Sequence, residues 1–449
     1  MKEKENSQKL QNQGPNLPRE PIDRIIEPIT RFLHVEAASG IILLLATIIA
    51  LILANSQFSD GYIAFWKTKI GFKIGSFEML HSLKHWISDG LMAIFFFIVG
   101  LEVKREMVIG ELREIRTAIL PIAAAIGGMI VPAAIYLAFQ AGEPGEQGWG
   151  IPMATDIAFV VGCIAVLGSR IPKILRVLLL SIAIVDDIGA ILVIAFGYTD
   201  SINTTALFWA FAGLGVVFIF AQIGVRNLFV YIIIGTFVWL GFHESGVHAT
   251  IAGVILGLMT PAKSYMSIGT LGKLLTSANE VVHGGRWEFE KHRGSQIRFF
   301  QRATRETIPP IEFLEEALHP WTSFVIMPLF ALANAGVAIQ LSGFINPIST
   351  AIMAGLVIGK PLGILIFSWI AVRFFIKKLP EGLNWGAMLG AGFLAGIGFT
   401  MALFIASLAL EGELLDSAKV GIIGGSVIAG IIGVCLLLAT LPENPVKNN

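Results

Sequence analysis

Long apolar stretches separated by short polar segments run from about residue 32 to residue 441. A helix needs about 20 apolar residues to cross a bilayer, and stretches of this length predict twelve transmembrane helices. Seven stretches contain no Asp, Glu, Lys or Arg: 37–59, 117–142, 201–225, 227–243, 245–262, 382–410 and 420–442. Four further spans carry such residues, at about 83–106, 149–170, 173–198 and 349–372. The one remaining span, which is span nine in chain order, begins the charge-free run 317–359.

The same pattern divides the chain into five parts. We expect a cytoplasmic N-terminal tail at 1–31, spans one to eight at 32–262, a cytoplasmic connector at 263–316, spans nine to twelve at 317–441, and a cytoplasmic C-terminus at 442–449. The tail is rich in Lys, Glu, Gln, Asn and Pro, which is typical of a disordered segment, and a short amphipathic helix could form at 22–32. The mixed charge of the connector favours a solvated linker over a regulatory segment.

Charge distribution predicts the orientation in the membrane. Of the 32 Lys and Arg residues, 26 fall on the side that holds both termini and five on the opposite side. Because positive charge accumulates in cytoplasmic loops, we expect both termini in the cytoplasm and the helices in a bacterial inner membrane.

Composition argues against several classes of protein. The chain has 55% hydrophobic and 14% charged residues and a mean hydropathy of +0.75. Soluble proteins carry about 25% charged residues, so a water-soluble enzyme is not expected. The net charge is zero, which gives no reason to expect nucleic acid as a partner. Cys163 and Cys435, the two cysteines, lie in apolar runs, so neither a disulfide scaffold nor a cysteine zinc site is expected.

Four charged residues lie near the middle of predicted spans: Asp156, Asp186, Asp187 and Lys360. Such residues mark ion or proton pathways by default, although they could also merely pair and hold helices together. Neighbours on a helix project about 100° apart, so one of Asp186 and Asp187 can face an ion cavity while the other faces a partner helix. Three acids against one lysine leave a negative excess that protons or a cation must offset. The pattern favours a site at which H⁺ and Na⁺ compete.

Helix-breaking residues interrupt two spans. Pro152 precedes Thr155 and Asp156 in span four, and span eleven has glycines at 386, 390, 392, 396 and 398. A broken helix exposes carbonyls and helix ends inside the membrane, where they can meet an ion; alternatively, the glycines permit close helix packing.

Span four is the middle of spans three to five, and span eleven is the middle of spans ten to twelve. An offset of seven spans gives the two triplets opposite topology, which predicts inverted repeats that cross at a binding site.

Eight motifs resemble those of the bacterial NhaA family of Na⁺/H⁺ antiporters. They are FIVGLEVKRE (97–106), ATDIAF (154–159), AIVDDIGA (183–190), SGVHATIAG (245–253), LHPW (318–321), FALANAG (330–336), IGKPLG (358–363) and GIGFT (396–400). They occur in the family's order across the whole membrane region. The resemblance implies an all-α membrane protein of twelve helices, with crossed, broken helices four and eleven, that exchanges Na⁺ or Li⁺ for H⁺ without a cofactor.

By matching positions, the resemblance implies roles for the intramembrane charges. Asp187 corresponds to the acid that binds Na⁺, with Asp156 beside it and Thr155 supplying a further oxygen. Asp186 corresponds to the acid that pairs with Lys360 and releases the pair as protonation changes. The N-terminal tail and the connector are longer than is usual for the family.

The resemblance also bears on pH response and assembly. Glu102 matches a charge at the cytoplasmic funnel, and His248 matches a histidine that is linked to pH response; a satisfied helix-end residue is the alternative for His248. The family is dimeric, and the alternating pattern at 66–77 is typical of a β-strand that could pair with a second protomer.

These observations predict electrogenic exchange by alternating access, which exports Na⁺ in return for a larger number of external H⁺ and serves pH and sodium homeostasis. A passive cation channel would need a ring of carbonyls or acids around an axis. An intramembrane aspartyl protease would need a Gly-x-Gly-Asp motif, whereas Met153, Ala154 and Thr155 precede Asp156 here. An organic-solute transporter fits crowded carboxylates less well than a small cation does. We therefore predict a transporter and not an enzyme.

Overall fold

The computed structural model describes residues 36–75, 77–199, 202–225, 227–267, 269–274, 276, 293–338 and 341–441. The predicted tail at 1–31, the predicted amphipathic helix at 22–32 and the C-terminus at 442–449 lie outside the described residues, as does the part of the connector at 277–292. The described part of the connector contains a helix, α14 (Arg293–Glu306), and the start of the next one.

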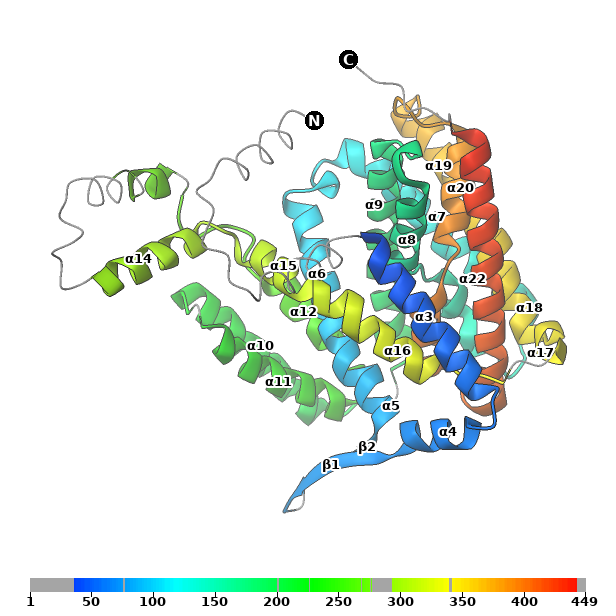
Figure 1. Cartoon of the computed structure of the whole chain (residues 1–449), viewed down its shortest axis with the longest axis horizontal. Helices are drawn as coiled ribbons and strands as arrows, with labels where there is room; N and C mark the ends of the chain where they lie inside the picture. The colour runs from blue at the N-terminus through cyan, green and yellow to red at the C-terminus, as the bar shows by residue number, and fades with distance from the viewer. Residues whose placement is uncertain are drawn as a thin grey trace, which may run out of the picture.

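Helices make up nearly all of the regular structure that is described (Figure 1). The first half contains α3 (Glu36–Ala54), α4 (Ser59–Lys67), α5 (Leu83–His85), α6 (Met92–Val108), α7 (Ile115–Gln140), α8 (Ile157–Leu167), α9 (Lys173–Gly197), α10 (Thr204–Ile223), α11 (Leu228–Ser245) and α12 (Thr250–Met259). The second half contains α14, α15 (Pro310–Trp321), α16 (Met327–Asn334), α17 (Leu341–Ile345), α18 (Pro347–Ala354), α19 (Lys360–Ala371), α20 (Trp385–Ala395), α21 (Phe399–Ala409) and α22 (Gly412–Thr440). Single π-helical turns at Trp86–Leu91, Thr322–Ile326, Gly355–Gly359 and Val372–Ile376 continue several of these helices.

Eight helices among the described residues are long and apolar enough to cross a membrane, and two bent pairs raise that number to ten. In the first pair α4 turns by 114° from α3, and in the second α21 turns by 46° from α20. The predicted span eight is represented by α12, which has ten residues, and the predicted span nine starts in the acidic helix α15. The prediction of twelve spans therefore exceeds what helix length and hydropathy show.

Large apolar side chains face outward on the peripheral helices. Phe196 on α9 is 84% exposed and Ile223 on α10 is 72% exposed. Figure 1 shows α10 and α11 as a pair at the edge of the bundle. Exposed apolar surface of this extent marks contact with lipid or with a partner, so the outward-facing apolar surface of these helices is consistent with burial in a bilayer.

A β-hairpin projects from the end of the bundle at which α4 lies (Figure 1). Strands β1 (Lys69–Ile74) and β2 (Phe77–Ser82) pair in antiparallel register, with Lys69 opposite Ser82 and Ile74 opposite Phe77. The β-like pattern predicted at 66–77 is present from Lys69 onward and continues to Ser82, whereas Trp66 and Lys67 end the helix α4.

Close glycine contacts hold α7 against α19. A Cβ atom on Gly127 would lie 2.2 Å from the carbonyl oxygen of Gly363, and one on Gly363 would lie 2.0 Å from the carbonyl oxygen of Gly127. Any side chain at either position would force the two helices apart. This packing fixes α19, whose first residue is Lys360, against the centre of the bundle.

The two predicted helix breaks are present. A 3-10 helix (Glu146–Met153) and α8 are separated by extended backbone at 154–156, and α20 and α21 are separated at 396–398. The glycines of span eleven act in two ways. Gly390 lies against Leu437 of α22, which is a packing role, whereas a Cβ on Gly398 would lie 3.0 Å from the carbonyl oxygen of Ala154 in the other break.

Candidate functional site

The two breaks meet inside the bundle and bond to each other directly. The backbone N–H of Asp156 donates to the carbonyl oxygen of Ile397 at 2.7 Å. The hydroxyl of Thr155 lies 2.9 Å from the carbonyl oxygen of Ala395. Backbone groups that an unbroken helix would pair internally are therefore hydrogen-bonded across the point where the two breaks meet, which we call the crossing. Both breaks are parts of one site.

Asp156 is held between the starts of two helices. It is the N-cap of α8, where its Oδ1 accepts the N–H of Phe159 at 3.2 Å. Its Oδ2 accepts the N–H of Thr400 at 2.9 Å and also the hydroxyl of Thr400 at the start of α21. Helix N-termini favour negative charge, so the breaks create a buried position that suits a carboxylate.

The role of Thr400 as a partner of Asp156 was missed by reasoning from the sequence. Thr400 is fully buried and ends the GIGFT motif, directly after the glycines that interrupt span eleven. A buried hydroxyl at the first turn of a broken helix was the available signal, because a polar side chain there must find a partner.

Asp186 and Lys360 form an ion pair that is completely buried. The Nζ of Lys360 lies 2.7 Å from the Oδ2 of Asp186, and both side chains are 0% exposed. Lys360 also donates to the carbonyl oxygen of Met153, and Thr155 lies 2.7 Å from the same Oδ2 of Asp186. The pair thus joins α9 and α19 to the break before α8. The structure places Thr155 on Asp186, where its single hydroxyl hydrogen can serve either Asp186 or Ala395.

Asp187 takes no part in that ion pair, as expected because neighbouring residues on a helix project about 100° apart. It is 3% exposed, and its Oδ2 has no hydrogen-bond partner among the described residues. Glu102, Asp186 and Asp156 act on it as like charges, and Lys360 acts as the opposite charge. A buried carboxylate oxygen in this setting is costly unless a proton or a cation offsets its charge. Asp187 is the best candidate for the ligand of an exchangeable cation.

Glu102 lies on α6, close to a group of charged residues that is distinct from the central carboxylates. Arg105, Glu106 and Glu315 act on it electrostatically, and the Nη1 of Arg105 donates to the carboxylate of Glu315 at the end of the connector. Burial raises the pKa of Glu315, and the Arg105 guanidinium opposes that rise. Glu102 therefore stands between the central carboxylates and the charged end of the connector.

His248 takes no part in the contacts described above. It directly precedes the start of α12, its ring centroid lies 6.2 Å from that of Phe404, and it acts electrostatically on Asp89. The structure thus brings Asp156, Asp186, Asp187, Thr155 and Lys360 together and places His248 elsewhere.

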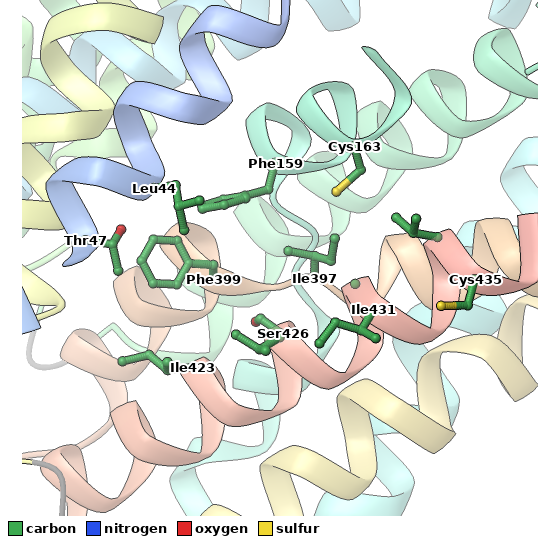
Figure 2. A pocket seen from close by; sticks show the side chains of 13 residues that line it. Leu44, Thr47, Phe159, Cys163, Ile397, Phe399, Ile423, Ser426, Ile431 and Cys435 are labelled. Carbon is green, nitrogen blue, oxygen red and sulfur yellow. The ribbon is translucent and has the colours of Figure 1, made fainter. Parts of the chain in front are cut away.

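An apolar pocket of about 420 Å³ lies beside the break in span eleven (Figure 2). Side chains of α3, α8, α21 and α22 line it, including Leu44, Phe159, Phe399 and Ile431. Its described lining contains no carboxylate, so it cannot offer the charged ligands that a small cation needs. It borders the meeting point of the two breaks through Ile397, whose carbonyl oxygen accepts the Asp156 N–H.

The chain is similar to known proteins over most of its length. A family model described as "Na+/H+ antiporter 1" matches residues 30–437. A protein named Na(+)/H(+) antiporter NhaA from Rhodopirellula baltica is 55% identical over 427 residues, which cover 95% of this chain and 97% of that protein. A protein of the same name from Rhizobium meliloti is 50% identical over 430 residues, with 95% and 98% coverage. The protein named NhaA 2 from Acidiphilium cryptum is 50% identical over 428 residues, with 95% coverage of each chain.

Proposed function

The chain belongs to the NhaA family of Na⁺/H⁺ antiporters, and we propose that it exports cytoplasmic Na⁺ or Li⁺ in exchange for a larger number of external H⁺. One observation carries this proposal. The carboxylate of Asp187 is buried and lacks a full set of partners, and it lies within electrostatic reach of Asp156 and of the Lys360–Asp186 pair. Such exchange would serve sodium and pH homeostasis.

Exchange follows from the use of the same acids by both ions. When Asp187 and Asp156 are ionised, their oxygens attract Na⁺ from the cytoplasmic side, and the hydroxyl of Thr155 and the carbonyls of the breaks supply further oxygens of the type that Na⁺ prefers. When the acids are protonated, the negative charge that holds Na⁺ is gone. Na⁺ and H⁺ therefore cannot occupy the site together. If the site can change from facing the cytoplasm to facing the outside only when one of the two ions is bound, the flux of Na⁺ is coupled to the flux of H⁺.

The Lys360–Asp186 pair is suited to carry the additional proton. Its contacts with Thr155 and Met153 connect it to the break before α8, so protonation of Asp186 would release Lys360 and alter the crossing. More than one H⁺ per Na⁺ moves net charge inward, and the membrane potential then contributes about 2.3 kcal/mol per charge per 100 mV.

We place twelve spans in a bacterial inner membrane, with both termini cytoplasmic. In this assignment α12 is a short span eight, and span nine runs from residue 317, near the end of α15, through α16. Spans three to five and ten to twelve would then form inverted repeats, which the interruption of the middle member of each triplet supports.

We also propose a homodimer that forms through the hairpin. The two-stranded sheet has β1 and β2 as its edges, and unpaired strand edges readily pair with another chain.

The function is tested in everted membrane vesicles that carry a pH-sensitive dye. Respiration acidifies the lumen, and added NaCl or LiCl should then reverse the dye signal, whereas KCl should not. An imposed Na⁺ gradient without respiration should itself drive proton movement, which separates an antiporter from a passive channel. Absence of any response to NaCl, with the protein shown to be inserted, would contradict the proposal.

We expect Thr400→Val to weaken Na⁺ binding and Thr400→Ser to preserve it. Valine removes the hydroxyl that donates to Asp156, whereas serine retains it. A hydrogen bond to a charged group contributes about 1.5–3 kcal/mol, which corresponds to a rise of about 10- to 100-fold in the apparent KM for Na⁺. The Na⁺ dependence of exchange in vesicles measures this, and an unchanged KM in the valine variant would show that the hydroxyl is not needed.

We expect Glu315→Gln to shift the pH dependence of exchange to lower pH. The variant removes a negative group that acts on Glu102, and it removes the carboxylate that accepts from Arg105, which keeps its ion pair with Glu106. Both changes make proton release near the cytoplasmic entrance easier, so the half-maximal rate should move by a few tenths of a pH unit. Glu316→Gln, at an exposed position on the same helix, is the matched control. A shift to higher pH would contradict the assignment.

A further inference from the structure

Three histidines converge at the end of the bundle from which the hairpin projects. His81 comes from β2, His85 from α5 and His243 from the last turn of α11. One ring nitrogen of each lies within 4.8 Å of those of the other two. The rings of His81 and His85 stack with centroids 4.3 Å apart, and the ring of His243 lies 5.2 Å from His81 and 5.6 Å from His85.

A carboxylate completes the group. The Oδ2 of Asp89, in the π-helical turn that follows α5, lies 3.5 Å from the Nε2 of His85 and 3.6 Å from the Nδ1 of His243. Two atoms bound to one tetrahedral Zn²⁺ at about 2.0–2.1 Å are themselves about 3.4 Å apart. The two measured separations are close to this value. The Nε2 of His85 is buried and makes no hydrogen bond among the described residues, although it faces Asp89.

We propose that His81, His85, His243 and Asp89 bind one transition-metal ion, with Zn²⁺ the best match. Three imidazoles and one carboxylate are a donor set that suits Zn²⁺, and four protein ligands make a closed, structural site. Small side-chain rotations suffice, because the nitrogens that must approach are already within 4.8 Å. None of these four residues is among those that meet at the two helix breaks.

The sequence contains a signal for this site that was not used. His81, His85 and Asp89 are spaced by four residues in the segment HSLKHWISD (81–89), but His243 lies far along the chain and joins them only through the fold.

A bound metal would tie the hairpin and the start of the helix Leu83–Val108 to α11. These elements already meet through Trp86 and Trp239, whose rings stack with centroids 6.2 Å apart. Because α10 and α11 lie at the edge of the bundle (Figure 1), a metal link at this point would stabilise their attachment.

The test uses the full-length protein in detergent, without a polyhistidine tag and stripped by a chelator. Titration with Zn²⁺ in a calorimeter should show one ion per chain. Titration with Co²⁺ should give the absorption bands of a tetrahedral nitrogen and oxygen site, and Zn²⁺ should displace the Co²⁺. Failure of the native protein to bind either ion would overturn the proposal.

Variants distinguish a specific metal site from incidental metal binding. We expect His243→Asn and His85→Asn to lower the Zn²⁺ affinity by at least about 100-fold, while His319→Asn, on α15 outside the cluster, leaves it unchanged. His243→Cys should restore binding and add a sulfur charge-transfer band to the Co²⁺ spectrum, which shows directly that this position is a ligand. Zn²⁺ should raise the Tm of the native protein and of His319→Asn but not of His243→Asn. Native affinity in both asparagine variants would overturn the proposal.

Discussion

Asp187→Asn is expected to abolish Na⁺/H⁺ exchange. The carboxamide keeps the size of the side chain but can neither ionise to attract Na⁺ nor release a proton. Because Asp187 has a buried oxygen without a hydrogen-bond partner among the described residues, no structural bond should be lost there. We expect the exchange rate to fall at least about 100-fold, which corresponds to about 2.7 kcal/mol, with little change in Tm.

The same substitution at an exposed acid is the matched control. Asp60→Asn on α4 should transport like the native protein in the same vesicle assay. Substantial exchange by Asp187→Asn, at any pH at which the native protein works, would show that the ion is held elsewhere.

Lys360→Met is expected to destabilise the protein strongly. Removing the lysine leaves the Asp186 carboxylate uncompensated at a position with no exposed surface, and breaking a buried pair in this way typically costs about 3–5 kcal/mol. Thermal unfolding in detergent should show a clear fall in Tm, and exchange should be impaired because the pair links the second proton to the break.

The double variant Asp186→Asn with Lys360→Met shows whether Lys360 stabilises the protein through its charge or through its packing. It removes both charges while roughly keeping both volumes, so most of the stability should return. Exchange should remain impaired, because the proposed carrier of the additional proton is gone. A double variant as unstable as the single one would mean that Lys360 acts through packing and not through its charge.

The sequence predicted those parts of the site that depend on local pattern. Asp156, Asp186, Asp187 and Lys360 were found because charges in apolar spans are rare, and the two breaks were found because proline and glycine interrupt helices. The separation of Asp186 from Asp187 followed from helix geometry alone. The family resemblance named Asp186 as the partner of Lys360, and these two side chains form an ion pair in the structure.

The remaining features depend on contacts between distant residues. The bond between Asp156 and Thr400 spans 244 positions, and no periodicity in the sequence could pair them. The three histidines likewise come together only because the fold places α11 beside the hairpin. The π-helical turn that directly precedes Lys360 also has no distinct pattern, because it differs from an α-helix only in the register of its backbone hydrogen bonds.

In the mechanism that we propose, one carboxylate site holds either protons or Na⁺. The most direct measurement is proton release from the purified protein in weakly buffered detergent solution when NaCl or LiCl is added. We expect the native protein to release protons, and we expect this release to disappear at alkaline pH, where the site has already lost its protons. Asp187→Asn should release none. Na⁺ binding without proton release, across the pH range in which exchange operates, would contradict it.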